Sequence, residues 1–193
     1  MKPIIFNTEM VKAILDSRKT QTRRVFSKTQ LKYFDYAQKL GEINGLDDLH
    51  ENNFSYILDF SKYKVDDILY VKETFALVNG GQYIFKADDN EKKYESVDLN
   101  IKWNSAVHLT QIEARIFLKV TNVRVERLQD ITAINMDSDM GAISPIISKL
   151  IAIDDYIELQ NKYKKYWNST AKDGYKWEDN PYVFVYEFER IEK

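Results

Sequence analysis

The sequence contains no cysteine, and His50 and His108 are the only histidines among its 193 residues. The absence of cysteine excludes a disulfide framework, a cysteine nucleophile and a cysteine zinc site. Two histidines also cannot form a three-histidine metal site. The paired aspartates at 47–48, 66–67 and 154–155 are adjacent in the chain, and adjacent side chains rarely point at one ion. We therefore expect neither a metal nor another cofactor.

Long apolar runs and glycine-rich turns are also missing. No apolar run approaches the roughly 18 residues that predict a membrane span, and the first ten residues lack the pattern of a secretion signal. The six glycines form neither a P-loop nor a G-x-G-x-x-G turn. These absences favour a cytoplasmic protein with no membrane partner and without the two common phosphate-binding turns.

The composition is that of an ordinary globular protein, with 44% hydrophobic and 30% charged residues. Because domains average roughly 150 residues, the whole chain, 1–193, is expected to form a single domain. Its 28 basic and 30 acidic residues give a net charge of −2. This balance excludes a globally basic nucleic-acid binder but leaves room for a local basic patch.

Hydrophobic periodicity and turn residues predict an α+β domain. Strands are expected at 3–6, 18–26, 66–78, 82–88, 113–128 and 181–191, and helices at 7–17, 132–141 and 144–168. The change of parity near Thr121–Asn122 predicts a bulge, and the Asn-Gly-Gly sequence at 79–81 predicts a hairpin. Since strands and helices do not alternate regularly, we expect a curved, mostly antiparallel sheet with flanking helices.

Two segments do not fit this pattern. Residues 27–62 have no clean period and are interpreted as an insertion, and 142–176 as a helical excursion. The acidic stretch 42–67, with seven acids and two lysines, could serve a partner.

The segment Arg18–Arg24 has the densest concentration of groups suited to chemistry. From Glu9 to Asp35 there are seven basic and three acidic residues, and basic side chains interleaved with hydroxyls are typical of phosphate contacts. On a strand Thr22 and Arg24 point to one face, which Lys19 reaches only if the chain bends. A solvated basic edge strand is the more common explanation of such a segment.

A threonine and a lysine could also act as a nucleophile and its base. Lowering a lysine pKa from about 10.4 to about 7–8 costs roughly 3–4 kcal/mol. The charges of Arg23 and Arg24 favour this shift, whereas a nearby carboxylate opposes it.

Four further residues are weaker candidates for a binding pocket: Glu73, Trp103, His108 and Arg115. Trp103 lies in a polar stretch close to His108, where an aromatic ring could stack on a base. Each also has an ordinary structural explanation, namely a loop histidine with hydrogen bonds, a packed tryptophan or a paired charge at a sheet edge.

Several sequence blocks, in this order, resemble ASCH-domain proteins of the longer type found in phages and prophages. They are "IIFNTEMVKAILDSRKTQTRR", "YKVDDILYVKETF", "ARIFLKVTNVRVERLQDIT", preceded by Trp103 and His108, and "NPYVFVYEFERI". The resemblance covers most of the chain except roughly 27–60, 88–100 and 142–176. It implies a PUA-like fold, a small β-barrel with flanking helices, and a family in which many members are thought to bind RNA.

Within this family, the resemblance extends to small amidohydrolases that deacetylate N4-acetylcytidine. It implies that Thr22 is the nucleophile, Lys19 its base and Asp139 the supporting carboxylate, with Arg24 stabilising negative charge or holding a phosphate. The family carries a glutamate at the position of Asp139 and usually glycine at the position of Ser17.

Other functions remain open from the sequence. The same pocket could bind RNA or a modified nucleoside without chemistry, with Lys19, Arg23 and Arg24 on phosphates and an aromatic ring on the base. The family also suggests a ribonuclease, and a phage chain could interfere with a host defence in the host cytoplasm. The oligomeric state and the choice between RNA and DNA are not determined.

Overall fold

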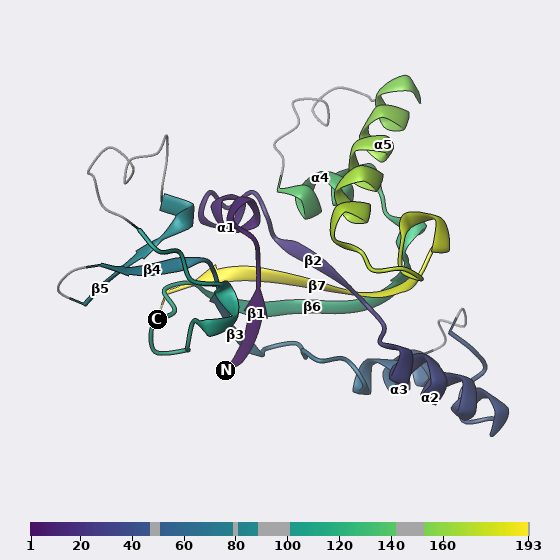
Figure 1. The fold of residues 1–193 in the computed structure, drawn as a ribbon. Coiled ribbons are helices and arrows are strands. Elements are labelled where there is room, and N and C mark those ends of the chain that lie inside the picture. Colours follow the sequence, from purple (N-terminus) through teal and green to yellow (C-terminus); the bar gives the residue numbers. More distant parts are fainter. Residues whose placement is uncertain (47–50, 79–80, 89–100, 142–152, 193) are drawn as a thin grey trace.

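A five-stranded sheet forms the centre of the structure, a computed structural model that describes residues 1–46, 51–78, 81–88, 101–141 and 153–192 (Figure 1). The strands are β1 (Lys2–Ile5), β2 (Gln21–Val25), β3 (Ile68–Lys72), β4 (Phe75–Val78), β5 (Gln82–Phe85), β6 (Phe117–Arg127) and β7 (Tyr182–Ile191). The helices are α1 (Thr8–Leu15), α2 (Lys28–Lys39), α3 (Glu51–Asp59), α4 (Ala133–Met140) and α5 (Ile153–Thr170). Short 3-10 turns lie at Lys86–Asp88, Ala106–His108, Leu128–Asp130 and Trp177–Asp179.

The central sheet has the strand order β1-β3-β6-β7-β2, and β4 and β5 form a separate hairpin. Only β1 and β3 pair in parallel, so the predicted mostly antiparallel sheet with flanking helices is confirmed. The predicted bulge is also present, because the β6–β7 register shifts between Val120 and Asn122. Among the described strands, β1 and β2 are the two edges, and no pairing between them closes the sheet into a barrel.

The two faces of the sheet carry separate hydrophobic cores, as alternation along β7 shows. Phe184, Tyr186 and Phe188 point to a core that contains buried residues of α1, α2 and α3. Val183 and Val185 point to a second core, which includes residues of α4 and α5. Successive side chains of a strand face opposite sides, so one strand can serve both cores. Figure 1 shows α4 and α5 packed together beside β2.

Helix α1 lies within the predicted range 7–17, although it ends at Leu15. Asn7 is its N-cap and accepts a hydrogen bond from the Met10 N–H at 2.9 Å. Val11 and Ile14 are buried in the first core. After the helix, Ser17 adopts a left-handed conformation with φ of 59°. This conformation explains why a glycine would suit the position, since it is unfavourable for a residue with a Cβ atom.

Replacing Ser17 by glycine should therefore raise the free energy of unfolding by about 0.5–1 kcal/mol. Relief of left-handed strain, worth about 1–2 kcal/mol, exceeds the extra entropy that glycine brings to the unfolded chain. Urea denaturation would measure the change. Ser55→Gly, at an exposed position in α3, is the control and should be destabilising, because glycine there has no strain to relieve. Loss of stability in both variants would contradict the prediction.

The structure corrects three of the expected elements. The strand predicted over 66–78 is interrupted at Glu73 and Thr74, because β3 pairs within the central sheet and β4 pairs with β5. The predicted strand 18–26 is shorter, because β2 begins only at Gln21 and the preceding residues form the turn that follows α1.

The third correction concerns the segment 27–62, which contains α2 and α3 instead of an aperiodic excursion. Helix α2 starts with a capping box between Ser27 and Gln30, but it buries only Phe34 and Ala37, which leaves a weak apolar period.

Two expectations extend beyond the described residues. The predicted helix 144–168 corresponds to α5 from residue 153 onward, and its earlier part lies in 142–152. The predicted hairpin joins β4 and β5 as expected, although 79–80 at its turn are outside the described ranges. In the part of the chain that is described, no helix combines the length and apolar character needed to cross a bilayer.

Candidate functional site

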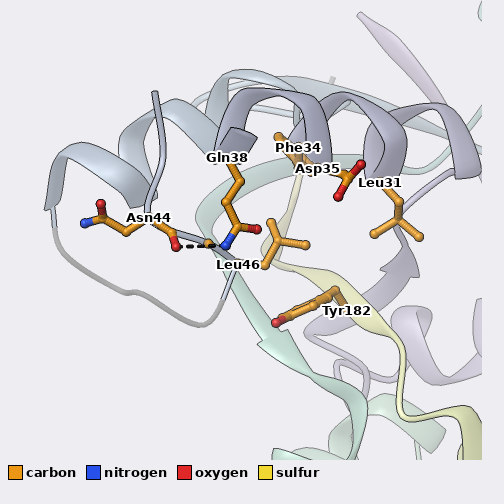
Figure 2. A pocket seen from close by; sticks show the side chains of 8 residues that line it. Leu31, Phe34, Asp35, Gln38, Asn44, Leu46 and Tyr182 are labelled. Atoms are coloured by element: carbon orange, nitrogen blue, oxygen red, sulfur yellow. Dashed lines mark hydrogen bonds between the residues drawn. The ribbon is translucent and has the colours of Figure 1, made fainter. Parts of the chain in front are cut away.

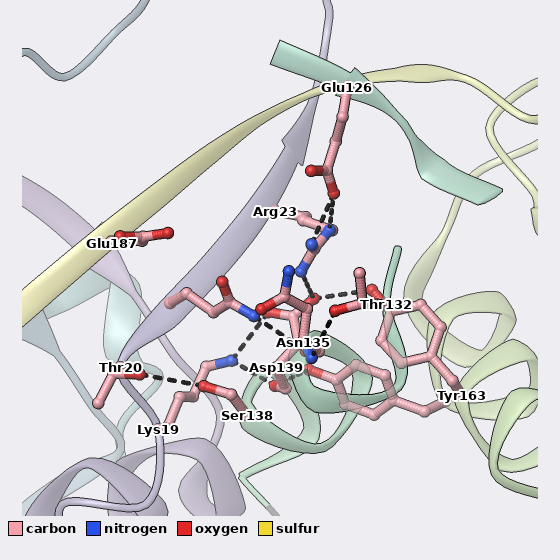
Figure 3. Close-up of polar contacts among 12 residues, drawn as sticks. Lys19, Thr20, Arg23, Glu126, Thr132, Asn135, Ser138, Asp139, Tyr163 and Glu187 are labelled. Atoms are coloured by element: carbon pink, nitrogen blue, oxygen red, sulfur yellow. Dashed lines mark hydrogen bonds and ion pairs between the residues drawn. The ribbon is translucent and has the colours of Figure 1, made fainter. Parts of the chain in front are cut away.

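Lys19 is a buried lysine held between α1 and α4 (Figure 3). The backbone N–H groups of Arg18 and Lys19 both donate to the carbonyl of Ala13, which turns the chain sharply after α1. This turn directs the Lys19 side chain, which has no solvent exposure, toward α4. Its Nζ lies 3.2 Å from Oδ1 of Asp139 and also donates to the Asp139 carbonyl. The structure thus brings together two residues that are 120 positions apart.

Asp139 accepts further hydrogen bonds from three other side chains. Its Oδ2 accepts from the Tyr163 hydroxyl at 2.7 Å and lies 3.3 Å from NH1 of Arg23. Its backbone carbonyl accepts from the Tyr166 hydroxyl at 3.2 Å. Both tyrosines come from α5, so this helix secures Oδ2 of Asp139 through Tyr163 and its backbone carbonyl through Tyr166.

Arg23 links this carboxylate to a second one in the sheet. Its NH2 and Nε lie 2.6 and 2.8 Å from Oε1 of Glu126 on β6. The Arg23 side chain has no solvent exposure, and Glu126 is 16% exposed. Lys19, Arg23, Asp139 and Glu126 therefore form a buried cluster of two positive and two negative charges, which satisfies the requirement that buried charges be paired.

The burial of this cluster shifts the pKa values of its members. Burial lowers the pKa of Lys19, Arg24 and Arg23 act in the same direction, and the opposing carboxylate of Asp139 does not restore the ordinary value. For Asp139, burial by itself would raise the pKa, but Lys19, Arg23 and the Tyr163 hydroxyl hold it below the ordinary value. Burial and the Asp139 charge raise the pKa of Tyr163 well above its ordinary value, so this hydroxyl remains a donor.

Thr22 and Arg24 lie on the other face of β2 from Arg23. Thr22 is 3% exposed and pairs in register with Tyr186 of the first core. The Cζ atom of Arg24 lies 5.5 Å from the centroid of the Phe6 ring, and Nζ of Lys19 lies 5.9 Å from the same centroid. Phe6 is therefore a common neighbour of Lys19 and Arg24. Among the described residues, Thr22 shares no hydrogen bond with Lys19, Arg23 or Asp139.

Helix α4 is positioned by contacts along residues 18–21. The Thr20 and Ser138 hydroxyls are 3.1 Å apart, and Nε2 of Gln21 donates to the Asn135 carbonyl at 2.9 Å. Gly141 caps α4 with φ of 67°, and its carbonyl accepts from Arg18. A Cβ atom at Gly141 would lie 2.3 Å from the Cβ of Ala13. The close approach of α4 to α1 therefore depends on glycine at this position.

The weaker candidates do not join this cluster. Arg115 pairs with Glu73 through two contacts of 2.9 and 3.0 Å and with Asp88 at 2.6 Å. Glu73 is 1% exposed, and burial raises its pKa despite the adjacent Arg115. In the described structure, no hydrogen bond or ion pair connects this group with Lys19 or Asp139. Glu73 and Arg115 are thus partners of each other.

Trp103 and His108 are also separate from the cluster. The ring of Trp103 lies beneath Lys86, whose Nζ is 4.7 Å from the ring centroid. His108 is exposed at the end of a 3-10 turn.

The sequence pattern did not identify four residues that surround the site: Phe6, Glu126, Tyr163 and Tyr166. Tyr163 and Tyr166 lie in the predicted helix 144–168, and helical spacing indicates which face packs but not where the tyrosine hydroxyls bind. Glu126 occupies one of the polar positions that alternate along β6, and this alternation does not indicate which residue of β2 it contacts.

Two cavities help to locate accessible space. A cavity of about 340 Å³ borders Lys19 and Thr20 and is closed on its other side by Phe188 and Arg190 of β7. A larger one, of about 530 Å³, lies between α2 and the start of β7 (Figure 2). Its lining includes a single ionisable carboxylate, Asp35, and lacks a nucleophile–base pair. The first cavity borders Lys19, although neither Thr22 nor Asp139 is among its lining residues.

Comparison of the chain with protein-family models, with curated proteins and with solved structures finds no match. Within the described ranges, no group of three or more His, Asp or Glu side chains is arranged to hold a metal ion. The argument for function therefore rests on the geometry of Lys19 and its neighbours.

Proposed function

We propose that the chain is an ASCH-type, PUA-like domain that binds a modified nucleoside or RNA and hydrolyses the amide of an N4-acylated cytosine. The observation that carries this proposal is the buried contact between Lys19 and Asp139. These two residues and Thr22 are the ones that the resemblance to N4-acetylcytidine amidohydrolases singles out. Lys19 is fully buried beside a carboxylate, and Thr22 follows three residues later on β2. Since the described contacts of Lys19 are with Asp139 and not with Thr22, the proposed reaction requires the Lys19 amine to turn from Asp139 toward Thr22.

The proposed reaction proceeds in two stages. Lys19, as the neutral amine, takes the proton of Thr22 while the Thr22 oxygen attacks the acyl carbonyl. The tetrahedral intermediate collapses, the C–N bond breaks, and the leaving amine takes the proton from Lys19. Water then hydrolyses the acyl-threonine ester and releases the carboxylic acid. Asp139 orients Lys19 or relays the proton, and Arg24 stabilises the developing negative charge.

The test is incubation of the purified protein with N4-acetylcytidine and chromatographic separation of cytidine. Lys19→Met and Thr22→Val should each lower the rate by at least about 100-fold, the typical contribution of a positioned base or nucleophile. Thr29→Val, at an exposed position in α2, is the matched control and should retain the wild-type rate. Undiminished turnover in Thr22→Val would contradict the proposed nucleophile.

The pH dependence provides a second readout of the same test. Only neutral Lys19 can accept the proton, so the rate should rise with pH through the pKa of Lys19. Since burial lowers this pKa, the midpoint should lie below the ordinary lysine value of about 10.4. A rate without dependence on pH up to that value would argue against Lys19 as the base.

A binding module without chemistry is the alternative, and the ion pair itself favours it. The carboxylate of Asp139 stabilises protonated Lys19, and an ammonium is a ligand for phosphate rather than a base. Absence of cytidine even at high protein concentration, together with RNA binding that weakens with salt, would support this alternative. Cleavage of RNA that carries no acyl group would instead indicate a ribonuclease.

A further inference from the structure

A groove of about 540 Å³ lies where β2 leads into α2, and the C-terminal end of α5 forms its opposite wall. The β2–α2 side contributes Arg24 and Lys28, and the α5 side contributes Trp167, Lys172 and Tyr175. Apart from β2, these elements belong to the segments that the family resemblance does not cover. The groove is therefore formed largely by parts that are particular to this chain.

The lining of the groove is basic, although the chain as a whole has a net charge of −2. It includes Arg23, Arg24, Lys28 and Lys172 and no acidic residue. Arg23 is neutralised by Asp139 and Glu126. In the described structure, no carboxylate forms an ion pair with the other three.

This lack of pairing contrasts with lysines within α2 and α5. Lys39 of α2 lies 2.7 Å from Asp35, and Lys162 of α5 lies 2.6 Å from Glu158. Such pairs would make an anionic ligand unnecessary at those positions. At Lys28 and Lys172 the positive charge remains available to a ligand.

Aromatic and hydroxyl groups complete the lining. Trp167 is mostly buried and its indole N–H donates to the Tyr175 carbonyl at 2.8 Å, which holds the α5 wall in place. Tyr175 is partly exposed, and Ser27 and Thr170 add hydroxyls. Cations for phosphates, together with an aromatic wall on which a base can pack, are the features of single-strand nucleic-acid sites.

Arg24 connects the groove with the Lys19 site. It lines the groove, and its guanidinium shares the Phe6 ring with the ammonium of Lys19. The guanidinium also donates to the Ile5 carbonyl at 3.0 Å, so Arg24 extends from the groove to the face of β2 opposite Arg23.

We propose that the groove binds the phosphodiester backbone of a single-stranded RNA segment that flanks the base held at Lys19. The inference rests on the proposed function in one respect, namely that the base occupies the Lys19 site. Binding of the RNA phosphodiester backbone by Lys28 and Lys172 does not require hydrolysis of the substrate, so it can be tested separately.

The experiment measures fluorescence anisotropy of a labelled single-stranded RNA of roughly eight cytidines, a length within the range that such sites cover. The double variant Lys28→Glu/Lys172→Glu should bind this RNA at least tenfold more weakly than the wild type. Its salt dependence should also be shallower, by about 0.7 in the slope of log K against log salt for each lost phosphate contact.

The matched control is Lys62→Glu/Lys165→Glu, which changes the net charge equally at two exposed positions outside the groove. It should bind RNA within about twofold of the wild type, since each residue lies away from the predicted contacts. Equal weakening in both double variants, or no RNA binding by the wild type, would overturn the proposal. Displacement of the RNA by cytidine monophosphate at equal nucleotide concentration would also overturn it, because a single phosphate would then suffice.

Deacetylation of free N4-acetylcytidine by the wild type, measured in parallel, tests the proposed chemistry and not the groove. RNA binding lost only in Lys28→Glu/Lys172→Glu supports the groove, even if no cytidine forms. Cytidine formation without RNA binding supports the chemistry and rejects the groove.

Discussion

Asp139→Ala is expected to lower the free energy of unfolding by about 3–5 kcal/mol, the usual cost of removing one partner from a buried ion pair. The variant leaves Lys19, which has no solvent exposure, without an opposing charge. It also removes the acceptor of the Tyr163 hydroxyl and one of the two carboxylates that neutralise Arg23. Urea denaturation followed by circular dichroism measures the loss.

Two further variants make this prediction specific to the ion pair. Asp130→Ala removes an exposed carboxylate from a 3-10 turn and should change stability by less than about 0.5 kcal/mol. Lys19→Met/Asp139→Ala removes both charges and should recover part of the stability lost in Asp139→Ala. If the double variant is no more stable than the single one, the unpaired charge of Lys19 is not the cause of the loss.

The same pair determines how stability depends on pH. Because the folded protein holds the pKa of Asp139 low, its contribution is present above the unfolded value of about 3.9 and is lost as pH falls through the lower folded pKa. The folded protein also lowers the pKa of Lys19. Between this lowered pKa and the unfolded value of about 10.4, the unfolded chain therefore binds more protons than the folded protein. The free energy of unfolding rises with pH in that window.

Gly141→Ala is the second change with a large expected effect, a loss of about 2–5 kcal/mol in the free energy of unfolding. Left-handed backbone conformation costs a residue with a Cβ atom about 1–2 kcal/mol, and overpacking adds about 1–3 kcal/mol. At Gly141 both terms apply, because φ is 67° and the new Cβ would lie 2.3 Å from that of Ala13. Relief of this contact would move α4 away from α1, and with it the carboxylate of Asp139.

Gly174→Ala separates the two terms. Gly174 also has a left-handed conformation, with φ of 82°, but nothing lies within 4 Å of a Cβ atom there. This control should therefore lose only the backbone term of about 1–2 kcal/mol. Equal losses in thermal or urea denaturation would show that the contact between α4 and α1 tolerates the added methyl group.

The local features of the fold were predictable because each depends on neighbouring residues. The start of α1, the bulge between Val120 and Asn122 and the hairpin of β4 and β5 follow from capping, alternation and turn residues. Helix α2 was missed because only two of its residues, Phe34 and Ala37, are buried. A helix with so little buried surface leaves a weak period in the sequence.

Some residues of the candidate site could also be identified from the sequence, and others could not. The resemblance selects Lys19, Thr22 and Asp139 as candidates, and the structure joins Lys19 to Asp139 by a direct contact. The parity argument on β2 also correctly separated Arg23 from Thr22 and Arg24. Neither source indicated Glu126 or Tyr163, which contact Arg23 and Asp139 from β6 and α5.

The sequence by itself therefore determined the α+β class, most of the strands and helices, and the basic segment around Lys19. These follow from interactions over a few residues, such as capping, side-chain alternation and local charge. The tertiary structure alone decided that Lys19 is buried against Asp139, that Glu73 pairs with Arg115, and that α5 forms a wall of the basic groove. Such contacts depend on how helices pack on the two faces of the sheet, and a one-dimensional pattern does not encode the partner across that distance.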